Sequence, residues 1–453
     1  MKLKPQNRKK SATTQLQEVL RANRNGKALG IYSICSANRF VLEAGMAQAK
    51  RDESLLLIEA TSNQVNQFGG YTGQTPAEFA DFVGEVADFM GLPRSRIVLG
   101  GDHLGPHVWR SNPAAVAMQH ARKLVSDYVR AGFTKIHLDS SMPLADDAVT
   151  KKLPLADEIV SERAADLCAA AETTHREMAG GSTAPVYVIG TEVPIPGGEQ
   201  AGSQAPEVTR AKSLAKTLQI ARKEFLKRGL ADAWKRVIAV VVQPGVEFGD
   251  QSVFGYDAKK AAALSKFCKQ HWHGVYEAHS TDYQAKDALR RMVQDHFAIL
   301  KVGPWLTFAF REAVFALEAV ERELACVRPG MKLSELAATL DEAMLENPKY
   351  WAGYYQGNES ALRFSRKFSY SDRVRYYWPQ ARVAEAVKQL IGNLSGEAIP
   401  VSLLSQYLPR QADRIRAGAL ANGPIELIRD KISEVIDQYS FACGMGRSKG
   451  APC

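Results

Sequence analysis

Short apolar runs alternate with longer amphipathic stretches along most of this chain. Eight of these runs are rich in β-branched, aliphatic or aromatic residues, which is typical of buried strands, and a helical pattern follows each one. The runs lie at about 29–35, 54–59, 97–101, 133–138, 185–190, 236–242, 273–278 and 297–302. Alternating strands and helices predict a parallel sheet, and eight such units predict closure into a (β/α)8 or TIM barrel. An open, doubly wound sheet is the alternative.

Capping signals indicate where several of the helices begin and end. Thr75 is followed by Pro76 and Glu78, which predicts a capping box with proline in the first turn. Asn112 stands before another proline and is expected to cap the next helix, which Gly132 should end.

Strand signals cease after about Lys332, and the rest of the chain looks helical. The helical patterns there cover about 333–345, 380–394, 402–418 and 424–440. No Gly/Ser-rich linker separates them from the barrel pattern, so we expect an extension packed on the barrel. The expected parts are a tail with a short helix at 1–27, the barrel at 28–331 and the helical extension at 332–453.

Composition excludes several classes of protein. The chain has 453 residues, 45% of them hydrophobic and 24% charged, so it can bury a large core and is not of the disordered class. Its longest apolar runs, such as Val237 to Val242, fall far short of the ~20 residues of a membrane span. The basic N-terminal segment has no apolar stretch behind it, and the six cysteines form no CxxC pair. We therefore expect a cytoplasmic protein without a signal peptide, a disulfide framework or a membrane partner.

The net charge of +9 owes several units to the N-terminal tail. The remaining basic residues are dispersed among acids and accompany no nucleic-acid-binding motif, so we expect no nucleic-acid partner. A pocket for phosphorylated metabolites would suit the same modest positive excess.

Polar and ionisable residues stand where nearly every apolar run ends. The active site of a (β/α)8 barrel lies at the carboxyl ends of its strands, so we expect these residues to surround one mouth. They include Ser33, Cys35, Glu59, Asn63, Asp102, His103, His137, Asp139, Glu192, Gln243, Glu277, His279 and Lys301.

Two histidines among these residues are the best candidates for metal ligands. His103 and His279 each directly follow a strand and have small or polar neighbours, and Glu192 and Gln243 are available to complete the shell. Two imidazoles with oxygen ligands suit a divalent metal, zinc or manganese. The alternative is that neighbouring carboxylates merely satisfy the histidines.

The carboxylates at the mouth supply candidate acids and bases. We expect Asp102 to act as the acid–base group, with Asp139 and Glu192 as further catalytic residues. His137 lies inside an apolar run and is expected to be a hydrogen-bonded core histidine, and His107 a surface residue.

Substrate contacts are expected from strand ends, from a glycine-rich loop and from the helical extension: Asn63, Gln67, Gly69, Gly70, Glu277, Lys301, Arg373 and Arg375. Lys301 could form a Schiff base or simply pair with a carboxylate. Arg373 and Arg375 could bind phosphate through forked hydrogen bonds or form salt bridges to the barrel. The chain has no P-loop, no dinucleotide-binding glycine motif and no GxSxG nucleophile elbow.

Four segments resemble the GatZ/KbaZ family: IEATSNQVNQFGGYTGQTPAEF, GGDHLGP, AGFTKIHLDSSM and FSYSDRVRYYWP. The resemblance runs from about residue 28 to the mid-440s. It implies a non-catalytic subunit of class II D-tagatose-1,6-bisphosphate aldolase, a label that alternates in this family with tagatose-6-phosphate kinase. Related proteins are described as stand-alone sugar-phosphate 4-epimerases.

A more distant similarity links the chain to the catalytic class II aldolases, which are zinc-dependent barrels. It implies that Asp102 is a proton shuttle, that His103 is a metal ligand and that His279 is the ligand from the seventh strand. Gln243 stands where those enzymes have a further histidine, and glutamine binds zinc more weakly.

Three functions remain open at this point. The chain is a component of a class II aldolase that needs a separate catalytic subunit, or a stand-alone 4-epimerase, or a sugar-phosphate sensor without turnover. We expect a phosphorylated ketohexose as ligand and an oligomeric protein. A kinase is disfavoured because no cradle for a triphosphate is recognisable.

Overall fold

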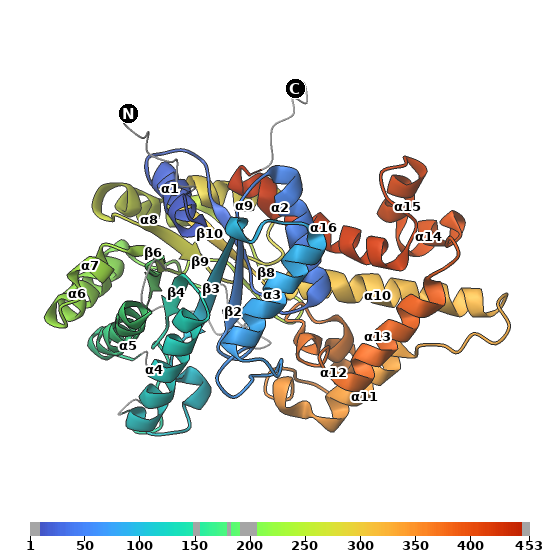
Figure 1. The fold of residues 1–453 in the computed structure, drawn as a ribbon, viewed down its shortest axis with the longest axis horizontal. Coiled ribbons are helices and arrows are strands. Elements are labelled where there is room, and N and C mark those ends of the chain that lie inside the picture. The colour runs from blue at the N-terminus through green and yellow to red at the C-terminus, as the bar shows by residue number, and fades with distance from the viewer. Residues whose placement is uncertain (1–9, 148–154, 179–182, 191–205, 446–453) are drawn as a thin grey trace, which may run out of the picture.

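Eight parallel strands close into a barrel in the computed structural model, which describes residues 10–147, 155–178, 183–190 and 206–445 (Figure 1). Their order around the barrel is β1-β10-β9-β6-β5-β4-β3-β2. The strands are β1 (Ile31–Ile34), β2 (Leu56–Thr61), β3 (Ile97–Leu104), β4 (Lys135–Leu138), β5 (Val186–Ile189), β6 (Val237–Val241), β9 (Val275–Ala278) and β10 (Phe297–Val302). The predicted barrel and its eight strands are confirmed. A small antiparallel pair, β7 (Glu247–Phe248) and β8 (Val253–Phe254), was not predicted.

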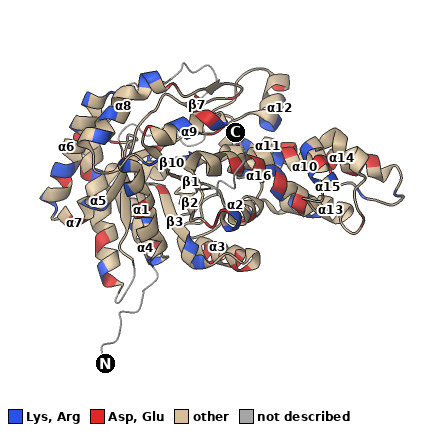
Figure 2. Cartoon of the chain, turned by 90° about the horizontal axis from the view of Figure 1, so that it is seen from above, with Lys and Arg blue, Asp and Glu red and all other residues tan. Residues whose placement is uncertain are grey.

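Helices surround the barrel, and more follow its last strand. The first ten are α1 (Ala12–Arg24), α2 (Arg39–Asp52), α3 (Pro76–Met90), α4 (Ala114–Arg130), α5 (Asp157–Glu177), α6 (Ala211–Lys227), α7 (Ala231–Trp234), α8 (Ala258–His271), α9 (Lys286–Gln294) and α10 (Pro304–Ala325). The extension contains α11 (Leu336–Glu346), α12 (Glu359–Phe368), the short 3-10 helix η4 (Arg373–Tyr376), α13 (Ala381–Leu394), α14 (Val401–Tyr407), α15 (Pro409–Arg416) and α16 (Pro424–Cys443). Figure 2 shows that basic and acidic positions are interspersed along these helices.

Local capping explains where two of these helices begin. The Thr75 hydroxyl accepts a hydrogen bond from the Glu78 N–H, and the Glu78 carboxylate accepts one from the Thr75 N–H, so the predicted capping box is present. The prediction that Asn112 caps α4 is wrong. That helix begins at Ala114, whose N–H donates to the carboxylate of Asp146 at 2.7 Å.

The barrel interior changes from apolar at the bottom to charged at the top. Leu16 and Leu20 of α1 close the bottom by packing on the inward-facing apolar residues of the strands. Side chains two residues apart point to the same side of a strand, so Leu57 is followed inward by Glu59 and Ile299 by Lys301. The upper layer therefore carries the ionisable groups.

The chain leaves the barrel along α10 and returns to it with its last helix. α16 packs against α2, α9 and β1 and so takes the place of an eighth barrel helix. The Gly30 N–H donates to the Cys443 carbonyl at 3.0 Å, and Arg429 donates to Glu43 at 2.8 Å. The helices between α10 and α16 form a lobe beside the barrel (Figure 1). The expected helical extension is thus present, while its boundary at residue 332 stays a prediction.

Among the helices in the described part of the chain, none is long and apolar enough to cross a membrane.

Candidate active site

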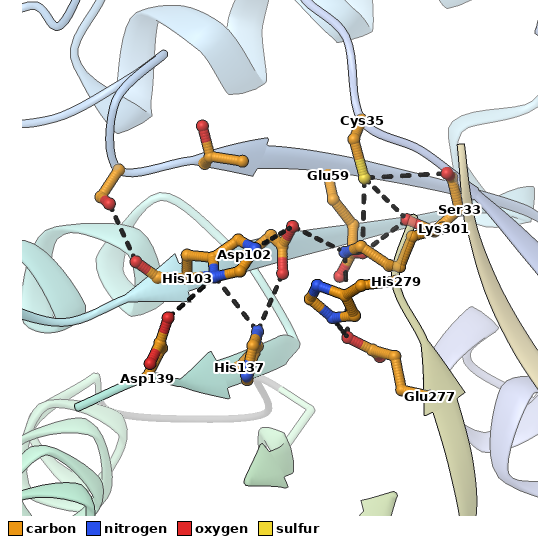
Figure 3. Close-up of polar contacts among 12 residues, drawn as sticks. Ser33, Cys35, Glu59, Asp102, His103, His137, Asp139, Glu277, His279 and Lys301 are labelled. Carbon is orange, nitrogen blue, oxygen red and sulfur yellow. Dashed lines mark hydrogen bonds and ion pairs between the residues drawn. The ribbon is translucent and has the colours of Figure 1, made fainter. Parts of the chain in front are cut away.

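The floor of the barrel mouth is a buried network of two lysines and three carboxylates. Lys135 Nζ lies 2.6 Å from Glu59 Oε1 and 2.6 Å from Glu277 Oε2. Lys301 Nζ contacts the other oxygen of Glu59 and lies 3.0 Å from Asp102 Oδ2 (Figure 3). None of these five side chains is more than 6% exposed.

Both lysines in this network are held in the charged form. Burial by itself lowers the pKa of a lysine, but the carboxylates around Lys135 and Lys301 raise the pKa of both amines above the ordinary value. A Schiff base requires a neutral amine, so the geometry favours an ion-pairing role for Lys301 over covalent catalysis.

Three histidine rings meet just above this floor. The ring centroids of His103, His137 and His279 lie 4.8 to 5.3 Å apart. One nitrogen of each ring contacts a carboxylate: His103 Nδ1 and Asp139 at 2.8 Å, His137 Nδ1 and Asp102 at 2.9 Å, His279 Nε2 and Glu277 at 3.0 Å (Figure 3). A carboxylate on one ring nitrogen fixes the orientation of the ring and leaves the other nitrogen for a metal. His137 Nε2 is buried and has no hydrogen-bond partner.

The donor set fits a divalent cation. Asp102, His137, Glu277 and His279 can each offer one ligand atom, and these atoms lie within 4.8 Å of one another. The four carboxylates of the mouth, those of Glu59, Asp102, Asp139 and Glu277, outnumber its two ammonium groups by two charges. Buried charge that is left unbalanced is costly, and one divalent ion would balance it.

Burial and the neighbouring charges together shift the pKa values of the titratable groups of the mouth. Burial raises the pKa of Asp102, but His103, Lys301 and the hydrogen bond from His137 lower it well below the usual range. For His103, burial lowers the pKa, but Asp102 and Asp139 raise it above the usual value. His279 is different, because burial lowers its pKa to about 4 and its imidazole stays neutral.

His103 holds its position through an unusual backbone conformation. Its φ is +48°, a left-handed value that is uncommon for a residue other than glycine and recurs at functional sites. The Ser62 hydroxyl donates to the His103 carbonyl at 2.8 Å. Gly105 follows, and a Cβ there would lie 1.6 Å from the Asp139 carbonyl oxygen, so the next turn needs glycine.

A cavity of about 90 Å³ opens above the histidines. Asn63, Tyr71, Asp102, His103, His279, Lys301, Arg375 and Tyr376 are among the residues that line it. Arg375 belongs to η4 in the extension, and its guanidinium donates to the carbonyls of Ser371 and Asp372 and to the Tyr376 hydroxyl. The helical extension thus supplies one wall of the mouth.

The structure therefore brings together most of the site residues expected from the sequence. Asn63, Asp102, His103, His279, Lys301 and Arg375 line the cavity, and Asp139 and Glu277 contact its histidines. Glu192 lies outside the described residues.

Gln243 is not part of this group. Its Oε1 accepts hydrogen bonds from the N–H groups of Gly245 at 2.8 Å and Val246 at 3.1 Å. The side chain therefore caps the turn that follows β6 instead of offering its oxygen to the mouth.

Four further expected contacts lie away from the cavity lining. Gln67 donates to the His120 carbonyl at 3.0 Å. Gly69 and Gly70 have positive φ, and a Cβ on Gly70 would lie 2.2 Å from the Gln64 carbonyl oxygen, so they shape the loop. Arg373 is buried with its guanidinium over the ring of Tyr354.

Sequence reasoning missed some groups at the mouth and misjudged the role of another. His137, expected at the mouth but as a core histidine, belongs to the histidine cluster, and Lys135, which was not expected there, belongs to the floor. Both lie on β4, two residues apart, and a lysine within an apolar run was the available signal. Asp282 accepts from the N–H groups of Gly303 at 3.0 Å and Trp305 at 2.8 Å at the start of α10, and burial raises its pKa to about 6.

Comparisons with known proteins agree with this architecture. Residues 16–444 match the model of the D-tagatose-1,6-bisphosphate aldolase subunit GatZ/KbaZ-like family. The chain is similar to a solved structure described as a probable tagatose 6 phosphate kinase from Sinorhizobium meliloti 1021. The identity is 45%, the TM-score is 0.82, and the match covers 91% of this chain and 100% of that chain.

Two other solved structures are similar at low identity. The fructuronate-tagaturonate epimerase UxaE from Cohnella laeviribosi is 11% identical with a TM-score of 0.49, covering 93% of this chain and 84% of that one. A fructose-bisphosphate aldolase from Campylobacter jejuni is 13% identical with a TM-score of 0.43, covering 85% and 93%. By its sequence match over nearly the whole length, the chain belongs to the GatZ/KbaZ-like family of D-tagatose-1,6-bisphosphate aldolase subunits.

Proposed function

We propose that this chain binds a phosphorylated ketohexose, such as tagatose 6-phosphate, at the barrel mouth and inverts its C4 centre by retro-aldol chemistry. The observation that carries the proposal is the cluster of His103, His137 and His279, each held by a carboxylate. A subunit that only supported another enzyme would not need a buried acid–base and ligand set of its own.

His137 and His279, together with a carboxylate oxygen of Glu277 or Asp102, would hold a divalent ion, zinc or manganese, and His103 is a proposed further ligand. When bound, such an ion polarises the ketose carbonyl as a Lewis acid. Glu192 stays a proposed further ligand, whereas the Gln243 oxygen is already used by its own turn.

The chain's own residues would carry the protons and hold the substrate. Asp102, kept charged by Lys301, takes the proton of the C4 hydroxyl as the C3–C4 bond breaks, and the bonding electron pair passes toward the C2 carbonyl. Rotation about C4–C5 then presents the other face of the new aldehyde. The C3–C4 bond re-forms on that face, and Asp102 returns the proton.

Phosphate recognition would come from the extension. The N-terminus of the helix that follows the last strand, a common phosphate site in these barrels, is already occupied here by the Asp282 carboxylate. Arg375 is the cation from the extension that lines the cavity, and its fork can hold phosphate oxygens. Holding the phosphate would keep the aldehyde fragment in the site while it rotates.

A second candidate function rests on the family. Its members are described as subunits of D-tagatose-1,6-bisphosphate aldolase, which favours a role beside a separate class II catalytic chain. In that case the barrel mouth of this chain would act only within the complex, and we expect the two chains to form an oligomer.

One experiment separates these functions. Purified protein, stripped with a chelator and reloaded with zinc or manganese, is incubated with tagatose 6-phosphate, and fructose 6-phosphate is followed by ¹³C NMR. We expect interconversion by the reloaded protein alone. No interconversion with either metal overturns the epimerase proposal, and bisphosphate cleavage that appears only after a class II catalytic chain is added supports the second candidate.

Variants of single residues test the roles within the mouth. Asp102→Asn should abolish turnover, whereas His103→Ala and His137→Ala should lower the metal content. Gln243→Ala is the matched control and should keep it. Equal metal in all four variants would refute the ligand set.

A further inference from the structure

A second cleft, of about 490 Å³, lies between the barrel and the helical extension. It is lined by the start of α2, the loop after β2, α10 and α13. Cys35, Gln64, Tyr71 and Arg375 line both this cleft and the catalytic cavity. Its volume and its position between two parts of the chain are typical of small-molecule sites.

Aromatic and aliphatic side chains form the walls of this cleft. The rings of Phe40 and Phe310 stack with centroids 5.3 Å apart and planes inclined by 17°. The rings of Trp378 and Phe310 meet edge to face with centroids 4.9 Å apart, and Ile391 adds aliphatic surface from α13. These walls favour a flat apolar body.

The charge of the lining has one sign. Arg39, Arg375 and Lys388 line the cleft, and no aspartate or glutamate is among its described lining residues. Arg39 and Lys388 lie at the more exposed edge, with side chains 49% and 79% exposed. Each has an acidic partner outside the lining, Glu43 at 2.9 Å from Arg39 and Glu385 at 3.6 Å from Lys388, which an anionic ligand would have to share or displace. The charges therefore favour an anionic group next to the apolar body.

A phosphorylated ketose does not match these walls. It carries an oxygen on every carbon, and hydroxyls buried against phenylalanine and isoleucine would lose their hydrogen bonds to water. The cleft therefore suits a ligand of a different class from the substrate proposed for the mouth.

We propose that this cleft binds an aromatic organic phosphate with the chemistry of a nucleoside diphosphate. The base would lie in the apolar part of the cleft, and the phosphates would face Lys388 and Arg39. Because Arg375 lines both cavities, an occupied cleft would alter binding at the mouth. The lining has no carboxylate to hold magnesium, so this site is a binding site and not a site of phosphoryl transfer.

Titration calorimetry with ADP on the full chain tests the proposal, which does not depend on the reaction at the mouth. We expect saturable binding of ADP, and binding roughly tenfold weaker for both adenosine and ribose 5-phosphate, which each lack one half of the recognised chemistry. Millimolar ADP that gives no saturable heat overturns the proposal.

Variants locate the bound nucleotide. Ala384 is exposed on α13 and lines the cleft, so Ala384→Trp should fill it and weaken ADP binding roughly tenfold. Ala263→Trp, the same change at an exposed position of α8, is the matched control and should bind as the parent does. Lys388→Glu should weaken binding, whereas Lys266→Glu on the distant α8 should not.

Binding of ADP to Ala384→Trp and Lys388→Glu with the parental affinity would overturn the proposal, because the nucleotide would then lie elsewhere. Turnover of the ketose phosphate without ADP should stay unchanged in both variants. A defect in turnover combined with normal ADP binding would also contradict the assignment.

Discussion

Replacing Lys135 by methionine tests whether the floor of the mouth is held by charge. The ammonium of Lys135 is fully buried and lies 2.6 Å from both Glu59 and Glu277. In the Lys135→Met variant, Glu59 keeps Lys301 as a partner. Glu277 keeps the hydrogen bond from His279, and the nearest remaining ammonium group, that of Lys301, is 3.9 Å away.

The expected cost follows from this geometry. Removing one partner of a buried ion pair leaves a buried charge uncompensated and costs roughly 3–5 kcal/mol. Domains are stable by roughly 5–15 kcal/mol in total, so the loss is a large share. The midpoint of urea unfolding, followed by circular dichroism at pH 7.5, should fall by an amount on the order of 1 M.

Two controls accompany this measurement. Lys212→Met makes the same chemical change on an exposed residue and should shift stability by less than about 0.5 kcal/mol. The double variant Glu277→Gln with Lys135→Met removes the uncompensated carboxylate together with its partner and should lose less than the sum of the single changes by more than about 1 kcal/mol. A Lys135→Met variant within about 1 kcal/mol of the parent, or additive single effects, would refute the reasoning.

Three further outcomes are expected. Because burial raises the pKa of Asp282 to about 6, above its unfolded value of 3.8, the parent should lose ~3 kcal/mol of stability in total as pH rises from 3.8 to above 6, of which about 1.4 kcal/mol falls between pH 5 and pH 8. Urea unfolding at pH 5 and pH 8 should show no such loss in Asp282→Asn, and an equal loss would contradict this origin. Arg375→Lys should raise the KM for the phosphorylated ketose about tenfold with little change in kcat, since a lysine cannot form two parallel hydrogen bonds to a phosphate. Arg373→Lys should leave the KM unchanged. Equal KM values for the two variants would contradict the assignment of phosphate binding to Arg375. Gly70→Ala places a Cβ 2.2 Å from a carbonyl oxygen at φ +57° and should cost roughly 1–3 kcal/mol in urea unfolding, so a neutral change would mean that the loop relaxes freely.

The fold could be predicted because barrel strands are short apolar runs at regular spacing. All eight strands appear at the predicted places. The β7–β8 pair could not be predicted, since two residues per strand give no periodic signal. The location of α16 could not be predicted either, because an amphipathic pattern shows that a helix has an apolar face but not which surface covers it.

The candidate site was predictable where an ionisable residue comes directly after the last apolar residue of a strand. That rule brought Asp102, His103 and His279 to one mouth. For His137 the rule gave the place but not the role, because the inward face of a strand changes from apolar to ionisable before the run ends. The rule failed to separate Gln243, whose side chain turns back on its own loop, since a sequence does not show which way a polar side chain at a turn points.

The return of α16 to the barrel has a consequence for how the protein is made. Hydrogen bonds join Arg429 to Glu43 and the carbonyl of Cys443 to the N–H of Gly30, across almost the full chain length. On the ribosome, the first strand and the first barrel helix emerge early and must wait for this last helix before their outer surface is covered. Until translation ends, that surface is a place where chaperones can bind. A premature stop codon at position 424, which removes α16 and the residues after it, would therefore uncover the first βα unit of the barrel and not merely shorten the lobe.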